Sequence, residues 1–152
     1  MPVDPGLAGR VFATTSPRDV SRSQLRAFAT AIGESDPVHH DLVAARAAGH
    51  PDLVAPPTYP VVVAFDAMNA LLADPDVGID LRHVIHAEQR FESVRPVYAG
   101  DELTATLTVD ALRTMAGSDI ITTRTELRTT AGEHVCTAFA KLAHSAPVEP
   151  PA

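Results

Sequence analysis

Residues 55–73 read APPTYPVVVAFDAMNALLA, and this stretch decides the fold. Prolines crowd its start, where the free N–H groups of a helix make proline tolerable. The remainder is almost wholly apolar and is interrupted only by Asp66 and Asn69. A helix that is apolar on most sides belongs in the middle of a domain. It is too short and too interrupted to cross a bilayer, which takes about 20 apolar residues.

The sequence after this helix changes from helical to alternating periodicity. From residue 82 onward apolar and polar residues alternate, most clearly in residues 102–113, ELTATLTVDALR. Alternation of this kind is typical of strands with one buried face. Glycines mark the turns between the expected strands, at Gly100-Asp101, Gly117-Ser118 and Gly132. We therefore expect consecutive antiparallel strands joined by short turns.

Two shorter helices are predicted before the apolar helix. Residues 21–32, SRSQLRAFATAI, offer Ser21 or Ser23 as an N-cap and one apolar face, and residues 41–49, DLVAARAAG, offer Asp41 as an N-cap. Helices segregated from a run of strands indicate an α+β domain. An antiparallel sheet curled around the long helix would bury the apolar faces of both. We therefore predict a single hot-dog fold.

Composition and charge favour a soluble cytoplasmic protein that binds neither nucleic acid nor membranes. The net charge is −7, and no run of Lys or Arg is long enough to neutralise a phosphate backbone. The N-terminus lacks the basic start and apolar stretch of a signal peptide. A single cysteine, Cys136, excludes an intramolecular disulfide. Residues 145–152, SAPVEPPA, are predicted to be a Pro-rich disordered tail after a domain at residues 1–144.

Three motifs resemble the signature of the MaoC-like hydratase/dehydratase family. Residues 33–39, GESDPVH, resemble the family's G-D-x-N-P-x-H, and residues 54–58, VAPPT, stand where the family carries an A-H-G-like step into its helix. Residues 90–101, RFESVRPVYAGD, resemble R-F-x-x-P-V-x-x-G-D. The resemblance covers roughly residues 8–144. It is closest to the actinobacterial stand-alone branch, similar to A-type subunits of (3R)-hydroxyacyl-carrier-protein dehydratases.

The resemblance implies hydration of a trans-2-enoyl thioester or dehydration of a (3R)-hydroxyacyl thioester, in fatty-acid metabolism. Such chemistry needs a carboxylate and an imidazole facing one water, and N–H donors aimed at the thioester oxygen. The family's catalytic positions fall on Glu34 and His39. Asp36, Pro57 and Thr58 stand where substrate contacts are expected. Coenzyme A or an acyl carrier protein would carry the substrate, and no other cofactor is expected.

Three of these positions depart from the family pattern. Glu34 replaces an aspartate and is one methylene longer, and a displacement near 1 Å can cost about 10²-fold in rate. Asp36 replaces an asparagine and adds a charge that favours protonated His39 and disfavours ionised Glu34. Pro57 replaces a glycine and has no N–H for the thioester oxygen. Thr58 or a neighbouring backbone donor would have to substitute.

Structural interpretations compete with the catalytic one. Asp36-Pro37 is also an ordinary turn or helix-start pair. His40 is expected to be exposed to solvent. A metal site at His39, His40 and Asp41 is disfavoured because adjacent residues rarely point at one ion, so we expect no metal.

Polar residues elsewhere leave further alternatives open. Asp66 and Asn69 could line an acyl tunnel, meet a partner subunit or form a polar edge. Cys136 is most simply a small buried side chain. The remaining candidates are Arg90 and Arg95, which could reach phosphates of a pantetheine-bearing substrate or lie on the surface, and His83, His86 and His134, expected as surface or cross-strand residues.

Three functions follow from these residues. The first is an (R)-specific 2-enoyl-thioester hydratase or (3R)-hydroxyacyl-thioester dehydratase using Glu34 and His39. The second is a non-catalytic acyl-binding subunit of a heterodimeric hot-dog dehydratase, which the three departures would suit. The third, a hot-dog thioesterase, is disfavoured by the Asp-Pro-x-His loop. An unpaired edge strand predicts a homodimer by default, with a heterodimer as the alternative.

Overall fold

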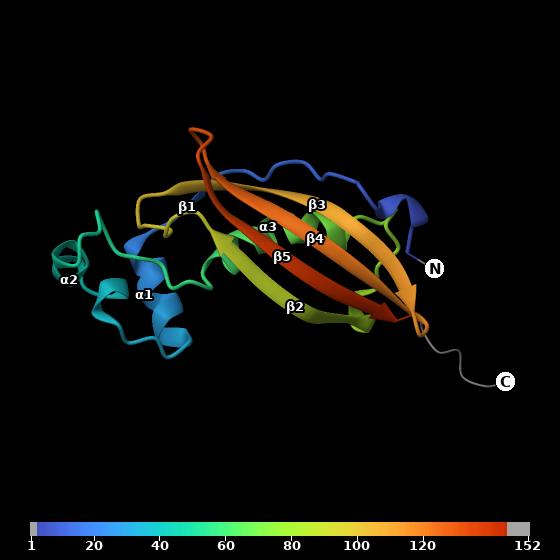
Figure 1. The fold of residues 1–152 in the computed structure, drawn as a ribbon, viewed down its shortest axis with the longest axis horizontal. Helices are drawn as coiled ribbons and strands as arrows, with labels where there is room; N and C mark the ends of the chain where they lie inside the picture. The colour runs from blue at the N-terminus through green and yellow to red at the C-terminus, as the bar shows by residue number, and fades with distance from the viewer. Residues whose placement is uncertain (1–2, 146–152) are drawn as a thin grey trace.

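A curled antiparallel sheet of five strands surrounds one long helix in the computed structural model, which describes residues 3–145 (Figure 1). The strands lie in the order β1-β3-β4-β5-β2. Their bounds are β1 (Arg18–Asp19), β2 (Val84–Ser93), β3 (Glu102–Met115), β4 (Ser118–Thr129) and β5 (His134–Ser145). The first long strand in the chain, β2, therefore pairs with the last, β5. This arrangement confirms the α+β prediction.

The sequence pattern explains the hairpin between β3 and β4. Leu103, Ala105 and Leu107 are fully buried while their neighbours along β3 are not, as the alternation predicts. The strand turns through Ala116-Gly117, whose φ angles are 50° and 80°. Two positive φ angles in succession fit the two-residue turn whose twist matches that of the strands.

Helix α3 (Pro60–Ala73) is the predicted apolar helix, and it packs against β3, β4 and β5 (Figure 1). Val63, Ala67 and Leu71 are fully buried between helix and sheet. The regular helix begins later than the predicted residue 55, because Ala55 and Pro56 each precede a proline, which disfavours helical geometry. Tyr59 before Pro60 is already helical, with φ −54° and ψ −33°. Residues 56–59 instead form a turn in which the Tyr59 N–H donates to the Pro56 carbonyl at 2.9 Å.

Helices α1 (Arg22–Ala31) and α2 (Leu42–Ala47) lie beyond one end of the sheet, at the left of Figure 1. A capping box between Ser21 and Gln24 starts α1, and the Asp41 side chain caps α2, as predicted. The short helical turns η1 (Pro5–Leu7), η2 (Pro37–His39) and η3 (Leu81–His83) complete the fold. Phe28 of α1 meets Tyr59 edge-to-face, with ring centroids 5.4 Å apart, and so ties α1 to the entry of α3.

The chain ends bear on two predictions. Ser145 is the last residue of β5, and the rest of the predicted disordered tail, residues 146–152, lies outside the described residues. Within residues 3–145, no helix is long and apolar enough to cross a membrane.

Candidate active site

A cavity of about 500 Å³ opens where the loop after α1, the entry to α3 and the end of β2 meet. Four of the five predicted site residues line it, namely Glu34, Asp36, His39 and Pro57. Thr58 does not line this cavity. It lies in a neighbouring hollow of about 470 Å³ between α3 and β2, which shares the Pro57 wall.

His39 is buried, and one of its ring nitrogens is committed to the backbone. Asp36 caps the turn η2 by accepting from the Val38 N–H at 3.1 Å, and Pro37 opens the turn. The turn carries His39 to a position where its Nδ1 lies 2.6 Å from the Val54 carbonyl oxygen. Because a carbonyl only accepts, Nδ1 carries the proton, and Nε2 of the neutral ring keeps its lone pair. The turn interpretation and the site interpretation of Asp36-Pro37 thus describe the same structure.

Glu34 is placed by the end of α1. The Glu34 N–H donates to the Ala29 carbonyl at 2.8 Å and the Gly33 N–H donates to the Thr30 carbonyl at 3.2 Å, while Gly33 has a φ of 74°. These two bonds form a Schellman motif, in which the residue after the glycine is usually apolar and packs on the helix. Here that residue is a half-buried carboxylate in a cavity. A local rule broken in this way points to a functional site.

The Glu34 side chain is itself oriented. Its Oε1 accepts the Asp36 N–H at 3.0 Å, and its Oε2 has no hydrogen-bond partner among residues 3–145. The cavity therefore holds a carboxylate oxygen and an imidazole nitrogen that the described part of the chain does not use. Such a pair can bind and activate one water.

His40 corrects one prediction. It is half-buried rather than exposed, because its Nε2 lies 2.7 Å from the Glu34 carbonyl oxygen. The Arg26 Nε donates in turn to the His40 carbonyl at 2.8 Å, from the middle of α1. Sequence reasoning missed both contacts, since neither His40 nor Arg26 belongs to a motif that marks a hydrogen bond to a loop.

The entry to α3 supplies few N–H donors. Pro56, Pro57 and Pro60 have none, and the Tyr59 N–H is already bonded within the turn. In the described segment 56–60, Thr58 alone keeps a backbone N–H without an acceptor. The predicted substitution of Pro57 by Thr58 as donor is thus possible for the backbone, although Thr58 faces the neighbouring hollow.

Comparison with known proteins identifies the family. A model described as FAS1-like, dehydratase domain region, matches residues 7–138. The chain belongs to this dehydratase family. A UPF0336 protein of Streptomyces coelicolor is 45% identical over 142 residues, which are 93% of this chain and 95% of that protein.

Solved structures agree with the family. A chain of the HadBC complex, a (3R)-hydroxyacyl-ACP dehydratase from Mycobacterium tuberculosis, is similar at 31% identity with a TM-score of 0.82 and coverage of 90% of this chain and 96% of that chain. A MaoC-like dehydratase is similar at 30% identity with a TM-score of 0.79, over 91% of this chain and 42% of that one. The predicted MaoC-like hot-dog dehydratase family is confirmed.

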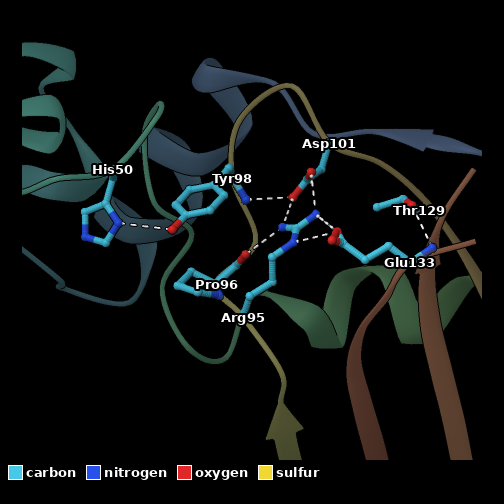
Figure 2. Close-up of polar contacts among 7 residues, drawn as sticks. All are labelled: His50, Arg95, Pro96, Tyr98, Asp101, Thr129 and Glu133. Carbon is cyan, nitrogen blue, oxygen red and sulfur yellow. Dashed lines mark hydrogen bonds and ion pairs between the residues drawn. The ribbon is translucent and has the colours of Figure 1, made fainter. Parts of the chain in front are cut away.

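In this member of the MaoC-like dehydratase family, the motif at residues 90–101 is mainly structural (Figure 2). Arg95 donates to both oxygens of Asp101 at 2.9 and 3.0 Å, to Glu133 at 2.8 Å and to the Pro96 carbonyl at 2.8 Å. These bonds, led by the one to Asp101, raise the pKa of Arg95 above its usual value. Although Arg95 borders the cavity, its donors are occupied within the chain, which favours the structural alternative over contact with a substrate phosphate.

Most other polar candidates have partners inside the chain. Asp66 forms a bidentate pair with Arg18, at 2.6 and 2.8 Å, and stays partly exposed, whereas Asn69 is exposed. Arg90 pairs with Glu92 and stacks over the Phe139 ring at 3.9 Å. The predicted histidines divide among three settings: His134 bonds Thr137, His86 lies near Phe65 on the β2 edge, and His83 belongs to η3 rather than to a strand.

Two further predictions concern Cys136 and metal binding. Cys136 is fully buried on β5, and burial raises the pKa of its thiol, so it is a core side chain as predicted. Within the described residues, His, Cys, Asp and Glu side chains do not gather in threes or more as a metal site would require.

Proposed function

We propose that this chain hydrates trans-2-enoyl thioesters, or dehydrates (3R)-hydroxyacyl thioesters, with Glu34 and His39 as the catalytic pair. One observation carries the proposal. Both side chains line a single cavity, and each keeps one atom, Glu34 Oε2 and His39 Nε2, without a hydrogen-bond partner among the described residues. Family membership supports the reaction class. Coenzyme A or an acyl carrier protein is the proposed carrier.

The pair can move the protons that hydration needs. As water oxygen bonds to C3, the lone pair on His39 Nε2 accepts a proton from that water, while the Glu34 carboxylate orients it. The electrons of the C2–C3 double bond move toward the thioester oxygen, and a proton then passes from the pair to C2. The net change is one hydroxyl at C3 and one hydrogen at C2. The Val54 carbonyl stabilises His39 in the tautomer that this step requires.

Replacing His39 tests this assignment. His39→Ala should lower the rate of crotonyl-CoA hydration by about 10²- to 10⁴-fold, the usual contribution of a positioned acid–base group. His134→Ala is the matched control, since His134 also makes one hydrogen bond but lies on β5 and does not line the cavity. Turnover that survives in His39→Ala would remove His39 from the mechanism. Release of free thiol from acyl-CoA would instead favour a thioesterase.

A second candidate function is a non-catalytic acyl-binding subunit of a two-subunit dehydratase. The helix entry favours it, because Thr58 has the one backbone N–H of residues 56–60 that finds no acceptor among residues 3–145, and Thr58 lies outside the cavity of Glu34 and His39. The likeness to a chain of the HadBC complex is consistent with such a partner. The discriminating experiment compares hydration by the purified chain with hydration after adding a hot-dog subunit that carries the unaltered signature. Activity that appears only in the mixture, and survives His39→Ala, would establish this second role.

Association is expected in either case, and the edge of β2 is its proposed site. This strand ends the sheet, and Ile85, Val94 and Phe65 beside it are 66%, 66% and 42% exposed. On the outer face, Glu88, Arg90 and Glu92 alternate in charge. Antiparallel pairing of two copies centred on Gln89 would set Glu88 of each copy opposite Arg90 of the other, which favours a homodimer. Light scattering on the purified chain distinguishes a dimer from a monomer that awaits a different subunit.

A further inference from the structure

The Glu34 peptide is fixed at three separate points. Its N–H is bonded to the end of α1 through the Schellman motif, and its side-chain Oε1 accepts the Asp36 N–H. Its carbonyl oxygen lies 2.7 Å from His40 Nε2. A carbonyl only accepts, so His40 Nε2 carries a proton and donates. The partners in the first two bonds are backbone groups of Ala29 and Asp36, and the partner in the third is the His40 side chain.

His40 is held by two backbone hydrogen bonds and does not line the cavity. Arg26 donates to the His40 carbonyl at 2.8 Å, and the His40 N–H donates to the Pro37 carbonyl at 3.0 Å. His40 is not among the residues that line the cavity, whereas its neighbour His39 is. Two adjacent histidines thus have different tasks: His39 faces the cavity, and His40 faces back toward the loop that carries the carboxylate.

We propose that His40 is a positioning residue for Glu34. By donating to the Glu34 carbonyl, His40 keeps the Glu34 carboxylate oriented toward the cavity that His39 also lines. The proposal rests on the function proposed for Glu34. Residues 34–36 belong to no helix or strand, so rotation of the Glu34–Ser35 peptide is opposed chiefly by this bond. Releasing it would swing the carboxylate without unfolding the domain, because α1 keeps its own cap.

Paired variants of His40 separate positioning from general stability. His40→Gln keeps an N–H donor at about the same reach, and His40→Leu removes it. His40→Leu should lower kcat for crotonyl-CoA hydration by about 10- to 10²-fold, the cost of a displacement near 1 Å, with KM little changed. His40→Gln should restore most of the rate. The matched control is His50→Leu, which removes a half-buried histidine bonded to the Tyr98 hydroxyl at 3.2 Å, outside the cavity (Figure 2).

A double-mutant cycle tests whether His40 acts through Glu34. In the Glu34→Gln background, His40→Leu should change kcat by less than about twofold, because the group it positions is already lost. Equal losses in both backgrounds would overturn the proposal. So would a failure of His40→Gln to restore the rate.

Hydrogen exchange of the Asp36 amide tests the positioning role of His40 even if the chain alone is inactive. The Asp36 N–H donates to Glu34 Oε1, so its exchange should accelerate about five- to tenfold in His40→Leu and stay unchanged in His40→Gln and His50→Leu. Absence of turnover in the wild-type chain, alone and with an added subunit, would refute the proposed function. Unchanged Asp36 exchange in His40→Leu would refute the positioning role, whatever the activity.

Discussion

Two loops border the same cavity, and they use their polar groups in opposite ways. In residues 95–101, Arg95 and Asp101 satisfy one another, and Asp101 also accepts the Tyr98 N–H at 2.9 Å (Figure 2). In residues 33–41, Glu34 and His39 both line the cavity, and each uses one atom to fix its orientation and keeps another without a hydrogen-bond partner in the described part of the chain. Both loops carry a motif that resembles the same family.

The difference shows how a motif can be assigned to folding or to chemistry. A side chain whose donors and acceptors are all occupied by its own chain stabilises the fold and has nothing left for a ligand. A side chain that is oriented by one bond and unpaired elsewhere is prepared for a reaction, at some cost in stability. The comparison therefore predicts large effects on stability from the first loop and smaller ones from the second.

The largest expected effect on stability is at Arg95. Arg95→Leu should lower the free energy of unfolding by about 2–4 kcal/mol, because it leaves the Asp101 carboxylate, whose side chain is only 14% exposed, without its main partner. Urea unfolding measures the loss. Arg90→Leu is the matched control, since Arg90 is paired with Glu92 in an exposed position on β2, and it should cost at most about 1 kcal/mol. Equal losses for the two variants would contradict the structural role assigned to the motif at residues 90–101.

A smaller effect is expected at Gly33, which holds the other loop. Gly33 has a φ of 74°, and an added Cβ would meet no atom within 4 Å, so the cost of a side chain is the backbone conformation alone. Gly33→Ala should lower the free energy of unfolding by about 1–2 kcal/mol. Gly33→Asn should cost less, because asparagine tolerates left-handed geometry better. If the two variants were equally destabilised, the Schellman motif would not be what holds Glu34.

Much of the fold follows from local patterns in the sequence. The alternation of Leu103, Ala105 and Leu107 fixes which face of β3 is buried, and the apolar stretch at Val63–Leu71 fixes the central helix. Local patterns do not specify that β2 pairs with β5, because that pairing joins segments distant in sequence and depends on the packing of the whole sheet.

The candidate site, like the fold, was predictable only where its residues lie close together in the sequence. Glu34, Asp36 and His39 lie within six positions of one another, so a motif could place them together. The bond from Arg95 to Glu133 was not predictable, since Glu133 lies on the far side of two strands in the chain. The bond from His40 to the Glu34 carbonyl depends on the exact path of an irregular loop, for which no residue pattern is diagnostic.

The smallest expected effect concerns an ion pair near the candidate active site. Arg22 of α1 binds Asp52 at 2.8 Å, just before the segment that supplies Val54, and its hydrogen bond holds the pKa of Asp52 at about 2, below the usual 3.8. A lowered pKa stabilises the fold above about pH 4, and that stability is lost as the pH falls toward about 2. The Arg22 side chain is 46% exposed, so solvent screening keeps the contribution of the pair small. Asp52→Asn, which keeps an oxygen for the Leu53 N–H, should therefore be less stable than the wild type at pH 6 in low salt and equal to it near about pH 2. A difference that persisted at low pH or in high salt would show a pair shielded from water, and the contrast with the Arg95 network would then no longer hold.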